Sequence, residues 1–405
     1  MPTTAPAPPR VAPAAPPRRR RGWPLGAAAA VCLFGAAAIL AGLRLTGPAP
    51  ATPVPAAAPR LSMPAAFTVA GTPVQLPWPA QGQAAVEVPG VGSFGTSGAV
   101  RPVPIASVAK VMTAYVVLAD HPLTGDEGGP TLTVSPAEAA AYPAQTAANQ
   151  SLVRVAAGEV LTERQALTAL LLPSADNIAQ ILARWDAGTP AAFVARMNAA
   201  AAKLGMADTR YTDPSGLDKG TVSTAVDQVK LAGRAMAVPA FAQLVGQSQA
   251  SIPVAGVVTN YNTLLGHDGI VGIKTGSTIA AGGCLLFAAR FRAGGRDLML
   301  LGAVLGQTGP LPKLLPMVLG ASQRLVQAGT AAVGPRVLVH AGDVVATVGD
   351  RRLVAAADLT VVGWPGLSVP AAAQVTVPAN APDGTAVGTV TAGGASVPVR
   401  TGART

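Results

Sequence analysis

The sequence is poor in cysteine and histidine, and each shortage excludes a class of protein. Only two of its 405 residues are cysteines, and the first, Cys32, lies in an apolar run far from Cys284, so we expect no disulfide framework. The three histidines, His121, His267 and His340, are scattered and lack the spacing of metal ligands. Because no phosphate-binding loop or other cofactor motif is present either, we expect neither a metal nor a cofactor.

Charged residues are also scarce, at 12% of the chain, and they are unevenly distributed. Residues 1–60 contain seven arginines and no acidic residue, whereas residues 61–405 contain 22 basic and 19 acidic residues. The net charge of +10 therefore comes mainly from the N-terminal segment. The remainder lacks the basic excess of a nucleic-acid-binding protein, so we expect no nucleic-acid partner.

The N-terminal segment has the composition of an export and anchoring signal. Residues 1–22 form a basic Pro/Ala-rich tail, and residues 23–43 form an uncharged apolar run about as long as one bilayer span. The four arginines at 18–21 favour a cytoplasmic N-terminus, so we expect a single cell-membrane span with the folded part outside. Residues 44–65 are a Pro/Ala-rich linker. The alternative is a signal peptide cleaved at A-P-A, 49–51, which would release a secreted protein.

In the rest of the chain the pattern of predicted helices and strands changes once, which indicates two folded domains. Residues 66–330 alternate between strand and helix patterns, with a strand at 84–90 and a long β-rich stretch at 269–305. They predict a large domain in which helices surround a sheet. Residues 336–405 consist of short strands separated by Gly/Pro turns, so we expect a small all-β domain there.

Three helix starts are marked by residues that cap helices. Thr162 with Gln165 fits a capping box, and Thr189 followed by proline fits a capped start. Ser223 is the predicted cap of a further helix.

The first motif with chemical content is IASVAKVMTAYVVL, residues 105–118, where Ser107 and Lys110 are the polar pair at the head of an apolar helix. Lysine is rare here, with six against 23 arginines. Residues three apart on a helix face the same side, so the two side chains can meet. A serine nucleophile needs a base, and a lysine in apolar surroundings loses its preference for the charged form. The pair therefore indicates nucleophilic catalysis.

Two further motifs come later in the chain. In LLLPSADNIAQ, Ser174 comes after an apolar helix and a proline, which predicts an exposed corner. In GIKTGSTIAAGG, Lys274, Thr275 and Gly276 begin an apolar strand. A lysine flanked by glycines on such a strand can hold an anion, and Gly276 allows another chain to approach closely.

The three motifs occur in the order S-x-x-K, S-x-N-like and K-T-G, which is typical of penicillin-binding proteins and β-lactamases. Over roughly residues 66–330 the chain resembles the serine D-alanyl-D-alanine carboxypeptidases, the low-molecular-mass penicillin-binding proteins. The stretches YTDPSGLD (211–218) and NYNTLLG (260–266) also resemble that family. The resemblance implies an α+β fold, with a β-lactamase/penicillin-binding-protein-like catalytic domain of antiparallel sheet and surrounding helices, and a small C-terminal all-β domain.

The resemblance also implies roles for the catalytic residues. Ser107 would attack the carbonyl between the two terminal D-alanines of a peptidoglycan stem peptide, with Lys110 accepting its proton. Ser174 would relay a proton to the leaving D-alanine, and water would release the acyl-enzyme. β-Lactams would acylate Ser107 and leave slowly.

The substrate-binding residues implied by the resemblance lie on the predicted strand around the third motif. Lys274 and Thr275 would bind the terminal carboxylate, with Gly276 beside them. The backbone N–H groups of Ser107 and Ser277 would form the oxyanion hole.

One residue departs from the family pattern. Asp176 occupies the place where the family usually has asparagine, and Asn177 is the next residue. An ionised aspartate can only accept hydrogen bonds, so it could pair with Lys110 and hold that base charged. Alternatively, Asn177 turns into the substrate-binding site, or Asp176 is tolerated there.

Three other functions share these motifs. A β-lactamase is one, although the chain has no glutamate after Glu163 to activate a deacylating water between the second and third motifs, as the commonest serine class requires. The second is an endopeptidase or transpeptidase that cuts or joins cross-links. The third is a non-catalytic, membrane-tethered cell-wall protein that lost activity through Asp176.

Overall fold

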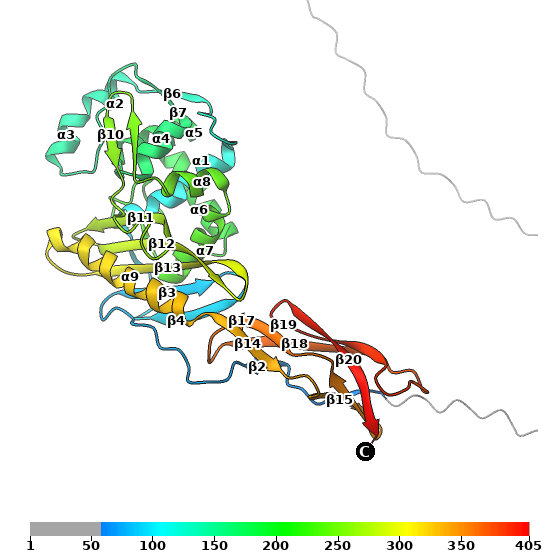
Figure 1. Cartoon of the computed structure of the whole chain (residues 1–405). Helices are drawn as coiled ribbons and strands as arrows, with labels where there is room; N and C mark the ends of the chain where they lie inside the picture. Colours follow the sequence, from blue (N-terminus) through cyan, green and yellow to red (C-terminus); the bar gives the residue numbers. More distant parts are fainter. Residues whose placement is uncertain (1–57, 405) are drawn as a thin grey trace, which may run out of the picture. The chain divides into compact units, whose positions relative to one another are not determined.

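The computed structural model describes residues 58–404 (Figure 1). The predicted tail at 1–22, the predicted span at 23–43 and most of the predicted linker at 44–65 lie outside the described residues. Those assignments stay predictions. Among residues 58–404, no helix combines the length and the hydropathy that crossing a bilayer requires.

The larger domain is built on a five-stranded antiparallel sheet, in the order β11-β12-β13-β3-β4. The strands are β3 (Gln83–Val88), β4 (Gly92–Ser97), β11 (Ile270–Thr278), β12 (Gly282–Ala293) and β13 (Arg296–Gln307). They confirm the strand and the β-rich stretch expected from the sequence. Strand β11, which carries the third motif, lies at an edge of the sheet, so one side of its backbone is available to other groups.

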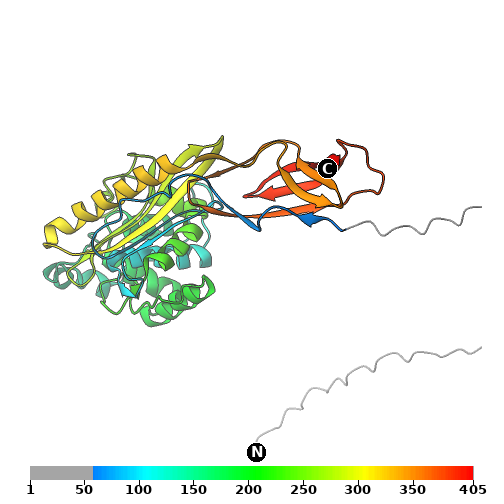
Figure 2. The same ribbon diagram turned by 90° about the horizontal axis from the view of Figure 1, so that it is seen from below.

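Helices cover both faces of this sheet. Their bounds are η1 (Ala106–Ala109), α1 (Lys110–Asp120), α2 (Pro136–Ala140), α3 (Tyr142–Ala147), α4 (Glu163–Leu171), α5 (Asp176–Ala187), α6 (Pro190–Lys203), α7 (Ala225–Met236), α8 (Pro239–Val245), η2 (Leu311–Lys313) and α9 (Leu314–Ala332). Helix α9 packs on β12 and β13 on one face, and the other long helices gather on the opposite face (Figure 2). Helix α1 is buried along most of its length because its apolar residues surround it almost completely. It forms the centre of the helical layer.

Three two-stranded ribbons complete this domain. They are β5 (Val103–Pro104) with β8 (Val222–Ser223), β6 (Thr131–Thr133) with β7 (Val160–Thr162), and β9 (Gln249–Ile252) with β10 (Gly256–Thr259). The β5–β8 ribbon matters for function, because β5 leads directly into the turn that carries Ser107.

The C-terminal part is all-β, as the sequence predicts. Its strands are β14 (Gly334–Val339), β15 (Val344–Val348), β16 (Arg351–Ala355), β17 (Leu359–Gly363), β18 (Ser368–Val375), β19 (Ala386–Ala392) and β20 (Ala395–Arg404). Strands β14 and β17 pair separately. The other five join β1 (Arg60–Leu61) and β2 (Ala66–Thr68) in a seven-stranded sheet, in the order β1-β15-β16-β20-β19-β18-β2.

The two edge strands of that sheet correct the predicted domain boundaries. Strand β1 (Arg60–Leu61) falls in the predicted linker 44–65 but pairs with β15. Strand β2 (Ala66–Thr68) falls in the predicted catalytic domain but pairs with β18. These strands have two and three residues, too few for an alternating pattern, and their partners lie far along the chain.

Two of the three predicted helix starts are confirmed. Thr162 and Gln165 form a capping box at α4, and the Thr189 side chain accepts a hydrogen bond from Ala192 N at α6. The third prediction is wrong by one residue: Thr224 caps α7, and Ser223 belongs to β8.

Candidate active site

Ser107 and Lys110 meet at the junction of η1 and α1. Ser107 lies in the 3₁₀ turn and Lys110 is the first residue of α1, with its side chain fully buried. Residues i and i+3 lie almost directly above one another in a 3₁₀ turn. The Lys110 Nζ is accordingly 2.9 Å from Ser107 Oγ. The sequence predicted this contact, although it placed both residues on one regular helix.

Lys110 has two further partners, and their chemistry decides which way its lone pair can point. Its Nζ donates to Asp176 Oδ1 at 2.6 Å and to the carbonyl oxygen of Ser215 at 2.9 Å. A carboxylate and a carbonyl can only accept, whereas the Ser107 hydroxyl can also donate. In the uncharged form of Lys110, its two N–H groups therefore go to Asp176 and Ser215, and its lone pair faces the Ser107 hydroxyl. This is the arrangement that a general base requires.

The charge state of Lys110 depends on two opposing influences. Burial lowers the pKa of Lys110 from its usual value, because desolvation disfavours the ammonium. The charge of Asp176 and its hydrogen bond to the ammonium, and the charge of Asp213, raise the pKa in opposition. Burial is the larger influence, so the amine is available at a lower pH than for an exposed lysine.

Both carboxylate oxygens of Asp176 accept hydrogen bonds. It is the first residue of α5, and its Oδ2 accepts from the backbone N of Ser151 at 3.0 Å while Oδ1 binds Lys110. Its backbone N also donates to the Ser151 carbonyl at 2.7 Å. Among the alternatives left open by the sequence, the structure therefore has Asp176 paired with Lys110.

Asn177 is not part of this cluster, so the alternative in which it turns into the substrate-binding site is not the arrangement that the structure has. Its side-chain amide donates to the Val153 carbonyl at 2.8 Å and accepts from the Val153 backbone N at 3.3 Å. Both polar atoms of this buried amide are thus bound to one backbone segment. Asn177 fixes that segment and does not replace Asp176.

Ser174 is buried, although its position after a proline predicted an exposed corner. Only 3% of the residue is exposed, and its backbone adopts a φ of 63°, in the left-handed region that non-glycine residues rarely occupy. Among the described residues, its Oγ has no hydrogen-bond partner. A buried hydroxyl without a partner costs free energy, which favours a role in contacting a bound molecule.

Lys274 lies on the edge strand β11 and is 1% exposed. Its Nζ donates to the carbonyl oxygen of Thr275 at 3.1 Å. Burial lowers the pKa of Lys274 well below its usual value, the charge of Lys110 lowers it further, and Asp176 opposes both. Gly276, two residues farther along β11, lies against backbone atoms of Ser107, so β11 brings Lys274 near the turn that carries Ser107. An incoming carboxylate would stabilise the charged form of Lys274.

Gly276 brings β11 against the catalytic turn, backbone to backbone. A Cβ at Gly276 would lie 2.9 Å from Ser107 N and 3.1 Å from Ile105 O, which is too close for any side chain. The close approach predicted for this glycine is therefore present. It places the Ser107 N–H beside the strand that continues to Ser277.

Two residues of the site were missed by sequence reasoning. Ser151 supports Asp176, and Ser215 binds Lys110 through its carbonyl. The stretch that contains Ser215 resembles the family, but its sequence does not predict this role, because any residue can supply a backbone carbonyl. Only the local fold determines where such a carbonyl points.

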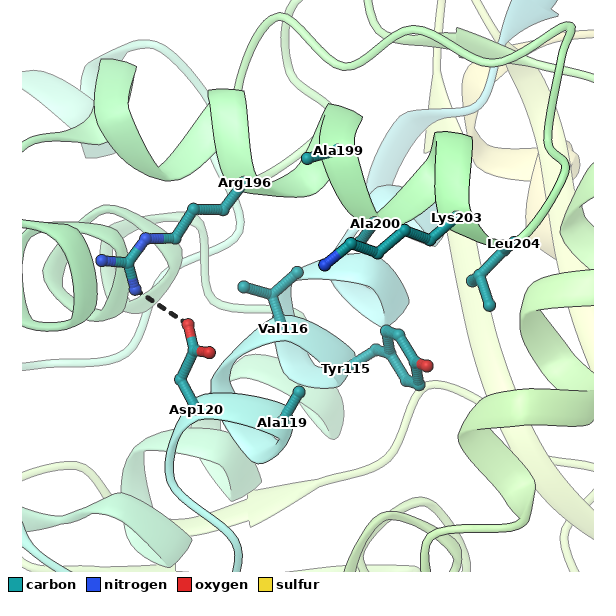
Figure 3. Close-up of a pocket in the computed structure, with 9 residues that line it drawn as sticks. All are labelled: Tyr115, Val116, Ala119, Asp120, Arg196, Ala199, Ala200, Lys203 and Leu204. Atoms are coloured by element: carbon teal, nitrogen blue, oxygen red, sulfur yellow. Dashed lines mark hydrogen bonds and ion pairs between the residues drawn. The ribbon is translucent and has the colours of Figure 1, made fainter. Parts of the chain in front are cut away.

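A separate groove lies between α1 and α6 and contains none of the predicted site residues (Figure 3). Arg196 and Asp120 pair across it at 2.8 Å, and Tyr115 and Lys203 lie farther along it. In the part of the chain that the structure describes, no cluster of three or more His, Cys, Asp or Glu residues could hold a metal ion.

Residues 97–307 match the family model of D-alanyl-D-alanine carboxypeptidases. A D-alanyl-D-alanine carboxypeptidase of Mycobacterium tuberculosis is 38% identical over 204 residues, which cover 49% of this chain and 65% of that protein. A D-alanyl-D-alanine endopeptidase of Pseudomonas aeruginosa is 33% identical over 208 residues, covering 50% of this chain and 64% of that protein. The chain thus spans just under two thirds of the length of these two relatives. The crystal structure of a Streptomyces DD-transpeptidase matches with a TM-score of 0.55 and 29% identity, over 64% of this chain and 100% of that chain.

Proposed function

Because the chain belongs to the D-alanyl-D-alanine carboxypeptidase family, we propose that it removes the terminal D-alanine from peptidoglycan stem peptides through an acyl-enzyme on Ser107. The observation that carries the proposal is the contact between Lys110 Nζ and Ser107 Oγ, where the other two partners of the amine can only accept. The same geometry supports acylation by β-lactams, which present a strained amide and a carboxylate to the same groups.

Acylation begins at the Ser107 hydroxyl. As Oγ attacks the carbonyl carbon between the two D-alanines, the Lys110 amine takes the hydroxyl proton. The negative charge that develops on the carbonyl oxygen is stabilised by the backbone N–H groups of Ser107 and Ser277. When the C–N bond breaks, the proton passes from the Lys110 ammonium through the Ser174 hydroxyl to the leaving amine. The products are a Ser107 ester and free D-alanine.

Deacylation reverses the roles. Lys110, again an amine, takes a proton from water as the water oxygen attacks the ester carbon. The ester bond to Oγ breaks and the proton returns to Oγ, which regenerates the enzyme and releases the shortened stem peptide. A positioned base of this kind contributes roughly 10²- to 10⁴-fold to such steps.

Binding of the substrate's terminal carboxylate is assigned to β11. The Lys274 ammonium would contact the carboxylate and the Thr275 hydroxyl would donate to it. Lys274 is buried, so its interaction with the carboxylate is screened only weakly by water.

The proposal is tested by incubating the purified protein first with a fluorescent penicillin and then with a peptide ending in D-Ala-D-Ala. We expect stable labelling, release of D-alanine, and loss of both in a folded Ser107→Ala variant. Labelling that disappears within seconds would indicate a β-lactamase instead. A folded protein that neither labels nor releases D-alanine would indicate the non-catalytic cell-wall protein.

An endopeptidase is the second candidate, since a relative bearing that name is 33% identical to this chain. The two activities differ in the leaving group of the scissile bond: a terminal D-alanine, or the side-chain amine of a neighbouring stem. Digestion of cross-linked muropeptide dimers separates them. Monomers released from dimers at a rate comparable to D-alanine release would favour the endopeptidase.

For the N-terminus we propose that residues 23–43 anchor the protein in the cell membrane with its catalytic domain outside. The length of the uncharged run and the arginines before it support this proposal. Cell fractionation with N-terminal sequencing tests it. An intact N-terminus in the membrane fraction supports the anchor, and a soluble chain beginning near residue 52 supports cleavage and secretion.

A further inference from the structure

The loop that precedes β8 is wound around the carboxylate of Asp213. The Asp213 Oδ2 accepts hydrogen bonds from the backbone N–H groups of Ser215, Gly216 and Leu217 at 3.1, 2.8 and 3.1 Å, and from the Ser215 hydroxyl at 2.5 Å. Its Oδ1 accepts from the Thr221 hydroxyl at 2.5 Å. One carboxylate thus sets the conformation of the loop, because without it the backbone N–H groups of Ser215 and Gly216 would lose their acceptor, and that of Leu217 would keep only the Ser215 hydroxyl at 3.3 Å.

The carbonyls of this loop hold the helix that carries Lys110. The Ser215 carbonyl accepts from Lys110 Nζ at 2.9 Å, and the Pro214 carbonyl accepts from Thr113 Oγ1 at 2.6 Å. Lys110 and Thr113 are three residues apart in α1, so they lie on the same side of the helix. Two consecutive loop carbonyls therefore fix the first turn of α1.

The same loop presses on the turn that carries Ser107. Gly216 has a φ of 83°, and a Cβ there would lie 1.8 Å from the carbonyl oxygen of Ala106, the residue before Ser107. Ile105 N donates to the Thr221 carbonyl at 3.3 Å, continuing the β5–β8 ribbon. The loop thus contacts Lys110 directly through the Ser215 carbonyl, and it reaches Ser107 through the preceding residue, Ala106.

We propose that Asp213 is a positioning residue that holds Ser107 and Lys110 in their reacting geometry by fixing this loop. The inference rests on the proposed function of those two residues. The charged groups that influence Lys110 are Asp176 from α5, Asp213 from the loop and, on β11, Lys274. The charge of Asp213 raises the pKa of Lys110, so the residue acts on the base by its charge as well as by position.

The test compares Asp213→Asn with Asp208→Asn. Asp208 is an exposed carboxylate in the segment between α6 and the loop, and its replacement changes the net charge equally. We expect Asp213→Asn to lower the second-order rate constant for acylation by a fluorescent penicillin about 10- to 100-fold. Because an opposing charge is removed, the acid limb of the pH–rate profile should also move to lower pH. Asp208→Asn should change neither.

Asp213→Glu separates position from charge. It keeps the charge but moves the carboxylate by one methylene, so the rate should fall while the acid limb stays close to that of the wild type. Wild-type rates in both Asp213 variants, with an unmoved acid limb in Asp213→Asn, would overturn the inference.

A second measurement does not depend on catalytic activity, or on the variant being as stable as the wild type. NMR of protein labelled with ¹³C at the lysine ε-carbons tracks the titration of Lys110, assigned with a Lys110→Arg variant. We expect its midpoint at lower pH in Asp213→Asn and unchanged in Asp208→Asn. An unchanged midpoint in both would contradict the proposed role. If the wild type does not acylate at all, the proposed function fails, and this midpoint still decides the question for Asp213.

Discussion

Lys110 Nζ lies 2.6 Å from Asp176 Oδ1, and both side chains are almost fully buried. A carboxylate occupies the place where the family pattern described above has an amide, and it contacts the group that we propose as the base. Burial lowers the pKa of Lys110, whereas Asp176 raises it. In the proposed mechanism, the balance between these two effects sets the pH at which Ser107 can be activated.

Replacing Asp176 by asparagine should move the working range of the enzyme. The carboxylate stabilises the Lys110 ammonium, so its removal lowers the pKa of Lys110 and increases the fraction of free amine below neutral pH. We expect the acid limb of the acylation profile to shift to lower pH in Asp176→Asn. The measurement is the acylation rate constant from pH 4 to 9, with Asp208→Asn as the control. A shift to higher pH would show that the carboxylate does not hold Lys110 charged.

We predict that the Lys274 ammonium binds the free terminal carboxylate of the substrate. Lys274→Gln keeps a side chain of similar length but removes the charge, and a charge-assisted hydrogen bond contributes about 1.5–3 kcal/mol. We expect kcat/KM for a peptide ending in a free carboxylate to fall roughly 10- to 100-fold. The matching peptide amide, already a poor substrate, should lose much less. Equal losses for both peptides would mean that Lys274 does not recognise the carboxylate.

We expect Gly276 to be required because a side chain at this position would not fit, and not because its backbone conformation requires glycine. A Cβ there would meet backbone atoms of the catalytic turn at 2.9 to 3.1 Å, so Gly276→Ala must push β11 away from Ser107. A displacement of about 1 Å costs on the order of 100-fold in rate, and we expect acylation to slow by that factor while the fold is retained. Gly334→Ala is the control, because no atom lies within 4 Å of its added Cβ. Wild-type acylation by Gly276→Ala would show that β11 does not need this approach.

Glu163 should make stability depend on pH. The residue is fully buried, neither carboxylate oxygen has a hydrogen-bond partner among the described residues, and burial raises its pKa to about 7. An acid with a raised pKa in the folded state favours folding below its unfolded pKa of 4.5 and loses that contribution as pH rises through about 7.

Glu163→Gln removes this titration. The measurement is the free energy of unfolding of the variant and of the wild type, from denaturant unfolding at each pH. Between pH 5 and pH 8, we expect the variant to become up to about 3 kcal/mol more stable relative to the wild type. The exposed Glu127→Gln controls for the loss of a carboxylate. A wild-type minus variant difference that does not change between pH 5 and 8 would contradict the raised pKa.

The residues that the sequence predicts best are those whose own identity carries the motif. Ser107, Lys110 and Gly276 were predicted because their contacts depend on short-range spacing or on the absence of a side chain. The predicted sheet, helices and C-terminal β domain are present for a similar reason, since hydrophobic patterns over long elements are read locally.

The features that sequence missed depend on contacts between distant segments. Ser215 acts through a carbonyl that any residue has, and its direction depends on Asp213. Asn177 binds Val153 because α5 packs beside that segment, and the burial of Ser174 also depends on its neighbours. The pairing of β1 with β15 joins segments almost 300 residues apart, which no local pattern indicates.

The proposed chemistry depends on a single reacting pair, in which an uncharged Lys110 takes the proton of Ser107. Labelling with a fluorescent penicillin, and then mass spectrometry of the digested protein, locates the adduct and gives its rate of formation. We predict an adduct on Ser107 that is absent in Ser107→Ala and forms at least about 100-fold more slowly in Lys110→Met, which keeps a similar side-chain volume. An adduct on any other residue, or a wild-type labelling rate in a folded Lys110→Met, would contradict the account.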